Sequence, residues 1–268
     1  MIKTLIEIIR NKRGRDVVGK GTWAKVYRNG DIAVKHFYNA PLDIVEKEAR
    51  NQAFAYNAGL PVPAVYGVRK LDDGTVALDM AYISGKPLMR FGMKKNEMRT
   101  VFNTLVKLQN QVHSVSAGDL PQVTESFKER IRHHSMKLDA QTKERLLALL
   151  SNLDKGYMNL CHGDFHPLNV IVDGDRHWII DWTDAGAGSP LIDVCRVYLQ
   201  ARCILSSAMA DMYLQCYCHE AKVQREDVLA WLPIWAALRL AEVISWRERI
   251  LLRKIVNKWF CESSSVSS

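Results

Sequence analysis

The sequence predicts an α+β fold with two lobes, a small antiparallel β-rich N-terminal lobe with one helix and a larger, mainly helical C-terminal lobe. Short apolar runs separated by turn dipeptides fill residues 15–85, whereas apolar side chains recur at helical spacing from about residue 94 onward. One β-like island, residues 160–184, interrupts the helices. A chain of 268 residues is long enough for one large domain or for two lobes.

The composition is that of an ordinary globular protein with an excess of positive charge. The chain has 37 Lys and Arg against 29 Asp and Glu, a formal net charge of +8, and 48% hydrophobic residues. These proportions exclude a disordered chain and a small disulfide-rich domain. Positive charge alone suits nucleic acid or an anionic membrane surface, but it identifies neither a fold nor a chemistry.

The sequence lacks the patterns of secreted and membrane-spanning proteins. The six cysteines include no CxxC pair, and residues 1–10 are not followed by the cleavage site of a signal peptide. The most apolar later stretch, residues 229–238, is broken by Pro233 and is shorter than the roughly 20 residues that cross a bilayer. We therefore expect a cytoplasmic protein with reduced thiols.

Three short strands are expected at the start of the N-terminal lobe. Residues 16–18 lead into Gly19-Lys20-Gly21, and residues 24–28 and 31–37 flank Asn29-Gly30, a dipeptide typical of two-residue hairpins. A glycine turn therefore joins the first two strands, and a tight hairpin joins the second and third.

A helix and a second hairpin complete this lobe. Residues 42–58 carry apolar side chains near helical spacing, and a glycine followed by two prolines ends that helix. Residues 65–70 and 75–83 flank an Asp-Gly turn. Because Gly and Pro punctuate the chain where the β-rich pattern ends, we divide the lobes into residues 1–85 and 86–260.

Helices fill most of the second lobe. Apolar residues recur at intervals of three and four from residue 98 to residue 112, which predicts a helix with that stripe in the core. Further helical patterns cover residues 124–136, 139–152, 190–218 and 225–259. We expect residues 261–268 to form a flexible tail.

The β-like island carries the most specific chemical signal. His162-Gly163-Asp164 and Asn169 precede one short apolar strand, and a second strand ends in Asp181. Phosphoryl transfer needs such a set, because one carboxylate orients a hydroxyl and takes its proton while Asn and Asp hold magnesium against the phosphates. Asp164 and Asn169 also have the Asp-x4-Asn spacing of the protein-kinase catalytic loop.

The residues of the island also allow two other interpretations. His162 and His166 have the four-residue spacing of a helical zinc pair, but Gly163 follows the first and Pro167 disfavours a helix at the second. A plain polar turn without chemistry is the other alternative. We expect His162 to brace the loop through hydrogen bonds rather than to act as a base.

The N-terminal lobe supplies parts that match a phosphate site. Gly19, Gly21, Thr22 and Val26 fit a glycine-rich loop that covers phosphates, with Ala24 in place of the third glycine. A glycine pair at a hairpin is often no more than a turn, so this signal is weak by itself.

A lysine on the third strand extends the pattern. Lys35 ends the run Ile-Ala-Val-Lys, where its ammonium could reach the α and β phosphates. The following helix offers Glu46 and Glu48 as the carboxylate that holds it. These two lie about 200° apart around a helix, so only one faces inward, and we favour Glu48.

Taken together, these motifs resemble the aminoglycoside phosphotransferase and choline kinase family of small-molecule kinases. The resemblance covers residues 15–250 and rests on the following segments: the 19–26 loop, Lys35, the Glu48 helix with residues 59–63, the 82–88 linker, residues 162–169 and Ile180-Asp181-Trp182.

The resemblance implies a protein-kinase-like fold that binds ATP and Mg²⁺. It casts Asp164 as the catalytic base, Asn169 and Asp181 as metal ligands, and Lys35 with Glu48 as the phosphate-binding pair. The remaining implied nucleotide contacts are the glycine-rich loop and the backbone near Ala81 and Ile83. Asp193 matches a family aspartate that supports the catalytic loop.

The acceptor is expected to be a small hydroxylated molecule. Residues 182–189 are too short a segment for the docking platform of a protein substrate. Basic residues outnumber acidic ones after residue 190, which weakens the expectation of a polycationic aminoglycoside. Four tryptophans could cage a quaternary ammonium but are more often core residues: Trp182, Trp231, Trp235 and Trp246.

Several alternatives stay open at this point. The acceptor could be choline, another amino alcohol or a lipid-linked sugar, or the chain could be a nucleotide-binding module without catalysis. The basic stretch 247–258 could dock on anionic lipid, although a solvated helix face is favoured. We expect no nucleic-acid partner, and the oligomeric state is open.

Overall fold

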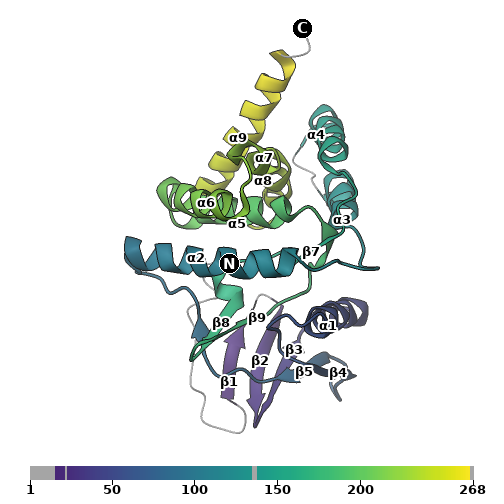
Figure 1. Cartoon of the computed structure of the whole chain (residues 1–268). Helices are drawn as coiled ribbons and strands as arrows, with labels where there is room; N and C mark the ends of the chain where they lie inside the picture. Colours follow the sequence, from purple (N-terminus) through teal and green to yellow (C-terminus); the bar gives the residue numbers. More distant parts are fainter. Residues whose placement is uncertain (1–15, 22, 135–137, 266–268) are drawn as a thin grey trace. The chain divides into compact units, whose positions relative to one another are not determined.

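The structure is a computed structural model that describes residues 16–21, 23–134 and 138–265 (Figure 1). The predictions for residues 1–10, for Thr22 and for residues 266–268 lie outside these ranges. The chain divides into two compact units. The first unit is Met1–Arg90 with Pro167–Ala185, and the second is Phe91–His166 with Gly186–Ser268.

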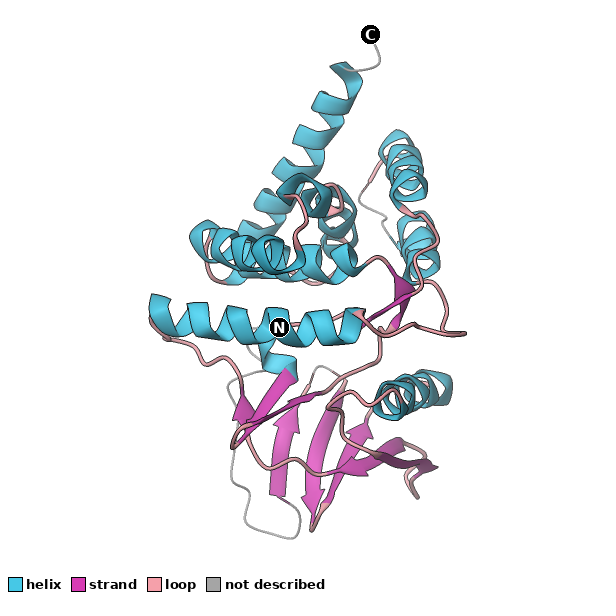
Figure 2. Ribbon diagram, in the orientation of Figure 1, coloured by secondary structure: helices cyan, strands magenta, loops and turns pink. Residues whose placement is uncertain are grey.

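The first unit is built on an antiparallel sheet with the strand order β1-β2-β3-β5-β4, drawn in magenta in Figure 2. Its strands are β1 (Asp16–Lys20), β2 (Ala24–Asn29), β3 (Ile32–Phe37), β4 (Val65–Lys70) and β5 (Val76–Ala81). Gly30, in the turn between β2 and β3, has φ +61°, which a glycine adopts at little cost.

Helix α1 (Leu42–Asn57) packs on this sheet. Val45 and Ala49 join Phe37, Val76 and Leu78 in one buried apolar cluster. The helix ends where Gly59 takes φ +82°, as the glycine and the prolines after it predict.

A second, three-stranded sheet in the first unit changes the predicted lobe boundary. It contains β6 (Lys86–Pro87), β8 (Val170–Asp173) and β9 (Arg176–Ile179) in the order β6-β8-β9. Because β8 pairs with β6, and Ile179 donates its N–H to the Pro61 carbonyl at 2.8 Å, Pro167–Ala185 belongs to the first unit. The first unit also ends at Arg90 rather than at residue 85.

Gly85 shows why the chain can make this pairing. A Cβ atom at Gly85 would lie 2.3 Å from the Val172 carbonyl oxygen, so a side chain there would push β8 away. Gly85, which marks the predicted lobe boundary in the sequence, is therefore also needed because its backbone passes very close to β8.

The second unit is mainly helical. Its helices are α2 (Lys95–His113), α3 (Val123–Glu129), α4 (Ala140–Leu153), α5 (Pro190–Ile204), α6 (Ser207–Ala221), α7 (Arg225–Leu229), α8 (Leu232–Leu240) and α9 (Trp246–Ser265), with a π-helical turn at Arg130–His134. A short sheet pairs β7 (Asn159–Cys161) with β10 (Gly186–Gly188). The apolar stripe of α2 is buried, and Phe102 contacts the Tyr213 ring at 5.6 Å between centroids.

Two predicted helices are divided in the structure. The pattern at 190–218 becomes α5 and α6, because Ser206 caps a new helix by accepting the Met209 N–H. The pattern at 225–259 becomes α7, α8 and α9.

The C-terminal boundary also differs. Helix α9 continues to Ser265 across the predicted start of the tail at residue 261, since no Gly or Pro interrupts it. Among the described residues, no helix combines the length and the hydropathy that a bilayer crossing requires.

Candidate active site

Lys35 lies at the centre of the first unit's polar cluster. Its Nζ atom is 2.5 Å from Glu48 Oε1 and 3.1 Å from Asp181 Oδ1. The Lys35 side chain is 14% exposed and that of Glu48 only 1%, so this ion pair is largely removed from water. Of the two glutamates considered, Glu46 instead lies on the exposed side of α1, 3.9 Å from Arg50.

The charges in this cluster hold Lys35 as an ammonium ion. Burial would lower its pKa, but the negative charges of Asp181 and Glu48 outweigh burial and raise the pKa above the ordinary value. Burial raises the pKa of Glu48, and the charge of Lys35 opposes this shift only in part. The lysine therefore stays charged throughout the neutral range.

Thr183 is a member of this cluster that sequence reasoning missed. Its hydroxyl lies 2.8 Å from Glu48 Oε2 and 3.2 Å from Asp181 Oδ1. It thus links the helix carboxylate to the carboxylate that follows β9. In the sequence, the only indication of this role is that Thr183 follows Asp181 by two residues.

Asn169 and Asp181 lie at the same end of the β8–β9 hairpin. Val170 pairs with Ile179, and the Ile180 N–H donates to the Asn169 carbonyl at 2.9 Å. Asp181 has φ +70°, a left-handed conformation that costs a non-glycine residue on the order of 1 kcal/mol and is often found at functional sites.

The donor atoms at this hairpin end fit magnesium. A carboxamide oxygen from Asn169 and a carboxylate from Asp181 are hard oxygen ligands, the kind that Mg²⁺ accepts together with phosphate oxygens and water. The Asp181 side chain is 43% exposed, so it can be approached from solvent.

The glycine-rich loop is formed between β1 and β2. Gly19 pairs with Val26, and the Gly21 N–H donates to the Ala24 carbonyl at 2.8 Å. Neither glycine has a positive φ, and a Cβ atom at either would meet only ordinary contacts of 3.5 Å. The turn itself does not require glycine, and what the glycines provide is room for a close approach to the backbone.

The two residues predicted to contact adenine, Ala81 and Ile83, differ in whether their backbone N–H groups are already hydrogen-bonded. The Ala81 N–H donates to the Ala64 carbonyl at 2.8 Å, so this donor is occupied. Ile83 forms no backbone hydrogen bond with a described residue. Of these two residues, Ile83 is therefore the one whose backbone N–H is available to a ligand.

Asp164 lies in the second unit, in the loop after β7. Its Oδ1 atom is 2.8 Å from Arg196 Nη2 and accepts a hydrogen bond from Gln200 at 3.1 Å, while Oδ2 is 3.6 Å from His166 Nε2. Arg196 also donates to the Gly163 carbonyl, and its guanidinium lies 4.9 Å from the centroid of the Trp235 ring.

Arg196 keeps the Asp164 carboxylate ionised. Burial would raise the pKa of Asp164, but the guanidinium of Arg196, with smaller contributions from the nearby His166 and His162 rings, lowers the pKa to about 2. Arg196 and Gln200 were not predicted. Their signal in the sequence is helical spacing, because Asp193, Arg196 and Gln200 follow one face of α5 at intervals of three and four.

Asp193 braces the loop that carries Asp164. Its carboxylate is fully buried and accepts the backbone N–H groups of His162 at 2.7 Å and Gly163 at 2.8 Å. His113 Nε2 lies 3.2 Å from the same carboxylate. Burial would raise the pKa of Asp193, but the hydrogen bond and charge of His113 outweigh it and lower the pKa.

His162 supports the same loop from within. It is fully buried, and its Nδ1 atom accepts the Asp164 N–H at 3.2 Å. Gly163 has φ +80°, so the tight turn between His162 and Asp164 needs glycine at this position.

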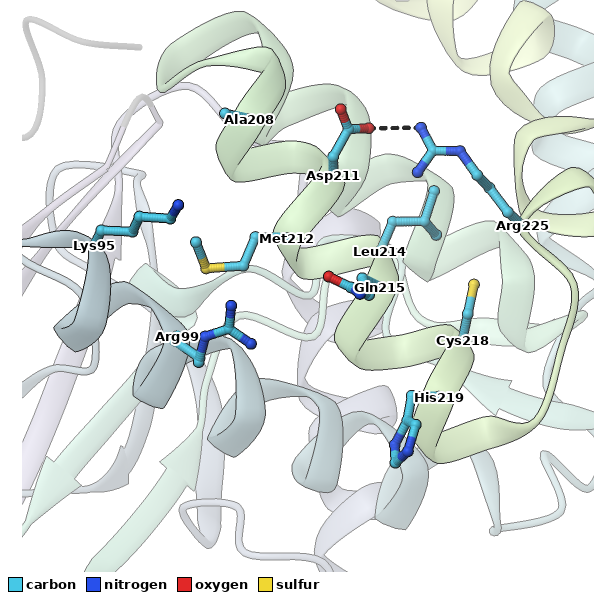
Figure 3. Close-up of a pocket in the computed structure, with 10 residues that line it drawn as sticks. All are labelled: Lys95, Arg99, Ala208, Asp211, Met212, Leu214, Gln215, Cys218, His219 and Arg225. Carbon is cyan, nitrogen blue, oxygen red and sulfur yellow. Dashed lines mark hydrogen bonds and ion pairs between the residues drawn. The ribbon is translucent and has the colours of Figure 1, made fainter.

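The predicted residues thus fall into two groups. The first unit brings together Lys35, Glu48, Asn169 and Asp181, and the second unit holds Asp164 with its supporting residues. A pocket of about 790 Å³ in the second unit is lined from α2, α6 and α7, and none of the predicted site residues lines it (Figure 3).

Three of the four tryptophans considered are buried in the described structure. Trp182, Trp231 and Trp235 are at most 4% exposed and belong to the core, as the alternative interpretation held. Trp246 is 68% exposed on α9.

The sequence and the fold are similar to those of known phosphotransferases. A model of the phosphotransferase enzyme family matches residues 21–240. The chain belongs to this family. Protein LicA of Haemophilus influenzae is 27% identical over 208 residues, which cover 70% of this chain and 56% of LicA. The chain therefore spans just over half the length of that curated relative.

Solved structures support the same fold for this phosphotransferase-family chain. A thermostable mutant of aminoglycoside phosphotransferase APH(4)-Ia, in ternary complex with AMP-PNP and hygromycin B, has a TM-score of 0.67 at 13% identity, covering 91% of this chain and 92% of that one. A choline/ethanolamine kinase family protein from Mesorhizobium loti has a TM-score of 0.59 at 17% identity, covering 95% and 88%. The predicted protein-kinase-like α+β fold is thereby confirmed.

Proposed function

We propose that this phosphotransferase-family protein transfers the γ-phosphate of ATP, in the presence of Mg²⁺, to a hydroxyl group of a small molecule. The observation that carries the proposal is the buried Lys35–Glu48 ion pair with Asp181 beside it and Asn169 at the same hairpin end. One neighbour of the same fold was solved with AMP-PNP, which is consistent with an adenine nucleotide as the donor.

The first unit binds the nucleotide in this proposal. The Lys35 ammonium contacts the α and β phosphates, and Glu48 holds it in place. The β1–β2 loop covers the phosphates, while the backbone at Ile83 receives the adenine. Asn169 and Asp181 hold Mg²⁺, which when bound neutralises negative charge on the phosphate oxygens.

Asp164 orients the acceptor hydroxyl. A carboxylate with a pKa of about 2 is a weak base, so it accepts a hydrogen bond first and takes the proton only as the new O–P bond forms.

The same residues limit the choice of acceptor. Arg196 places a positive charge against Asp164, which opposes an acceptor with several ammonium groups. The aromatic support for a choline-like acceptor is weak, since three of the four tryptophans are buried. A neutral or anionic hydroxylated molecule therefore suits the site better than an aminoglycoside.

The test is ADP formation from ATP and Mg²⁺ over a panel of sugars, aminoglycosides, macrolides, choline-like amines and thiamine-like alcohols. We expect one class to give turnover, and Asp164→Ala to abolish it while AMP-PNP binding stays close to wild type. Asp175→Ala, in the exposed β8–β9 turn, is the matched control and keeps full activity. Full turnover in Asp164→Ala would refute the mechanism, and nucleotide binding without transfer to any acceptor would support the non-catalytic alternative.

A further inference from the structure

Helix α9 has a solvent-exposed face that the proposed chemistry does not use. The exposed side chains on this face, which we call the α9 face, recur at intervals of one, three and four along the helix. They are Trp246, Arg247, Ile250, Arg253, Lys254, Asn257 and Lys258.

The opposite side of α9 is fixed to the core. Leu252 is 0% exposed and Val256 3% exposed, and the helix packs against α8. Leu252 and Val256 are about one helical turn apart, so they lie on the same side of the helix. Their packing against the core keeps the α9 face turned toward solvent.

The charge on this face has one sign. Among its described side chains are four cations and no carboxylate. Glu248, the acid next to Arg247 in the sequence, is turned inward, where it accepts a hydrogen bond from Arg239 Nε at 2.8 Å with only 15% of its side chain exposed. Glu248 is therefore engaged by Arg239 rather than by Arg247, Arg253 or Lys254.

Large apolar side chains are exposed at the N-terminal end of the same face. Trp246 is 68% exposed and Ile250 45%, and Val243 just before the helix is 98% exposed. The Arg247 guanidinium lies 5.6 Å from the centroid of the Trp246 ring. Trp231 and Trp235, on the neighbouring part of the same unit, are buried instead.

We propose that the α9 face binds the surface of a bilayer that contains anionic phospholipid. Arg247, Arg253 and Lys254 lie over the headgroups, and Trp246 and Ile250 enter the interface between headgroups and acyl chains. Cations beside an exposed Trp are the usual composition of helices that lie on membranes.

The apolar residues decide between lipid and nucleic acid. A polyphosphate backbone would attract the cations equally well, but it would leave Val243 and Ile250 in water. A lipid interface accommodates both features. This inference is independent of phosphate transfer, because none of the residues it uses has a role in that reaction.

Sedimentation with vesicles tests the inference. The full chain is mixed at low salt with phosphatidylcholine vesicles that either contain or lack phosphatidylserine. We expect binding only to the anionic vesicles, with release as the ionic strength rises. A lack of binding to anionic vesicles at low salt would overturn the proposal.

Paired variants test whether vesicle binding depends on the cations of the α9 face or only on the net positive charge of the protein. Each cation near an anionic surface contributes about a fivefold gain in partitioning. Arg253→Gln with Lys254→Gln should therefore reduce binding about 25-fold, by the same constants. The matched control, Lys107→Gln with Lys155→Gln, removes equal charge from exposed positions elsewhere in the second unit and should bind as wild type.

Two further outcomes are decisive. Trp246→Ser keeps every cation, and it should weaken binding to anionic vesicles while leaving any binding to duplex DNA unchanged. Equal loss in both variant pairs, or tighter binding to DNA than to vesicles, would overturn the proposal. ATP turnover with a soluble acceptor should be the same in all these variants. The proposal of membrane binding can therefore be refuted without refuting the proposed phosphate transfer.

Discussion

Replacement of Glu48 by Gln is the sharpest test of the first unit's cluster. The change preserves the shape of a side chain that is 1% exposed and removes its negative charge. Lys35 then keeps Asp181 as its remaining carboxylate, 3.1 Å away. The ammonium should move toward Asp181, away from the position assigned to the phosphates.

The magnitude follows from the contacts that are lost. A hydrogen bond to a charged group contributes about 1.5–3 kcal/mol, so weaker phosphate binding by Lys35 should raise the Kd for AMP-PNP with Mg²⁺ by about 10- to 150-fold. Loss of one partner of a buried ion pair costs about 3–5 kcal/mol. Asp181 compensates in part, so we expect a smaller stability loss of about 1–3 kcal/mol.

Isothermal titration calorimetry with AMP-PNP and Mg²⁺ measures the first effect, and urea unfolding measures the second. Glu46→Gln is the control, because that carboxylate is two residues away on the same helix and is 47% exposed. It should change stability by less than about 0.5 kcal/mol. If the two variants bound AMP-PNP with the same Kd, the assignment of Lys35 to the phosphates would be wrong.

Three other predictions concern the scaffold and the loop. Asp193→Ala removes the acceptor of two buried backbone N–H groups and should cost about 3–5 kcal/mol in urea unfolding, and a loss below about 1 kcal/mol would contradict the bracing role. The pKa of Asp164 falls from 3.8 to about 2 on folding, so its contribution of about 2 kcal/mol is present above pH 3.8 and lost as the pH falls to 2. Asp164→Asn should therefore flatten the unfolding free energy between these two pH values, and an unchanged slope would refute the shift. Gly85→Ala should destabilise the first unit by about 1–3 kcal/mol, since its Cβ would meet the Val172 carbonyl at 2.3 Å, whereas Gly67→Ala has open space and should be tolerated.

Local patterns predicted much of the fold and part of the site. The strand pair around Asn29-Gly30 follows from a turn that needs left-handed backbone. Helical periodicity likewise predicts that only one of Glu46 and Glu48 faces inward, and the favoured Glu48 is the one that pairs with Lys35. Both are short-range properties that a sequence records directly.

Long-range contacts account for what the sequence did not reveal. The pairing of β6 with β8 joins residues more than 80 positions apart, so nothing local to Lys86 or Val172 indicated that Pro167–Ala185 belongs with the first unit. Thr183 and Arg196 were missed for the same reason, because each side chain is recognisable only through its partner carboxylate.

Helix α1 determines the geometry of the first unit's cluster. Glu48, Asn51 and Gln52 are all buried, and burial of polar groups is unfavourable unless each finds a partner. Asn51 donates to the Trp182 and Ala185 carbonyls at 3.0 and 3.2 Å, and Gln52 donates to the Pro63 carbonyl at 2.8 Å.

These bonds tie one helix to the lysine strand, to the chain before β4 and to the loop after Asp181. A shift of α1 would break all of them together, since each partner is an atom of fixed backbone or a buried ion. The position of Lys35 relative to Asp181 is thus set by a helix whose polar residues face inward. Glu46, the other carboxylate that the sequence offered, lies at the surface instead, where it and its neighbour Arg50, 3.9 Å away, both stay in contact with water, so its charge needs no buried partner.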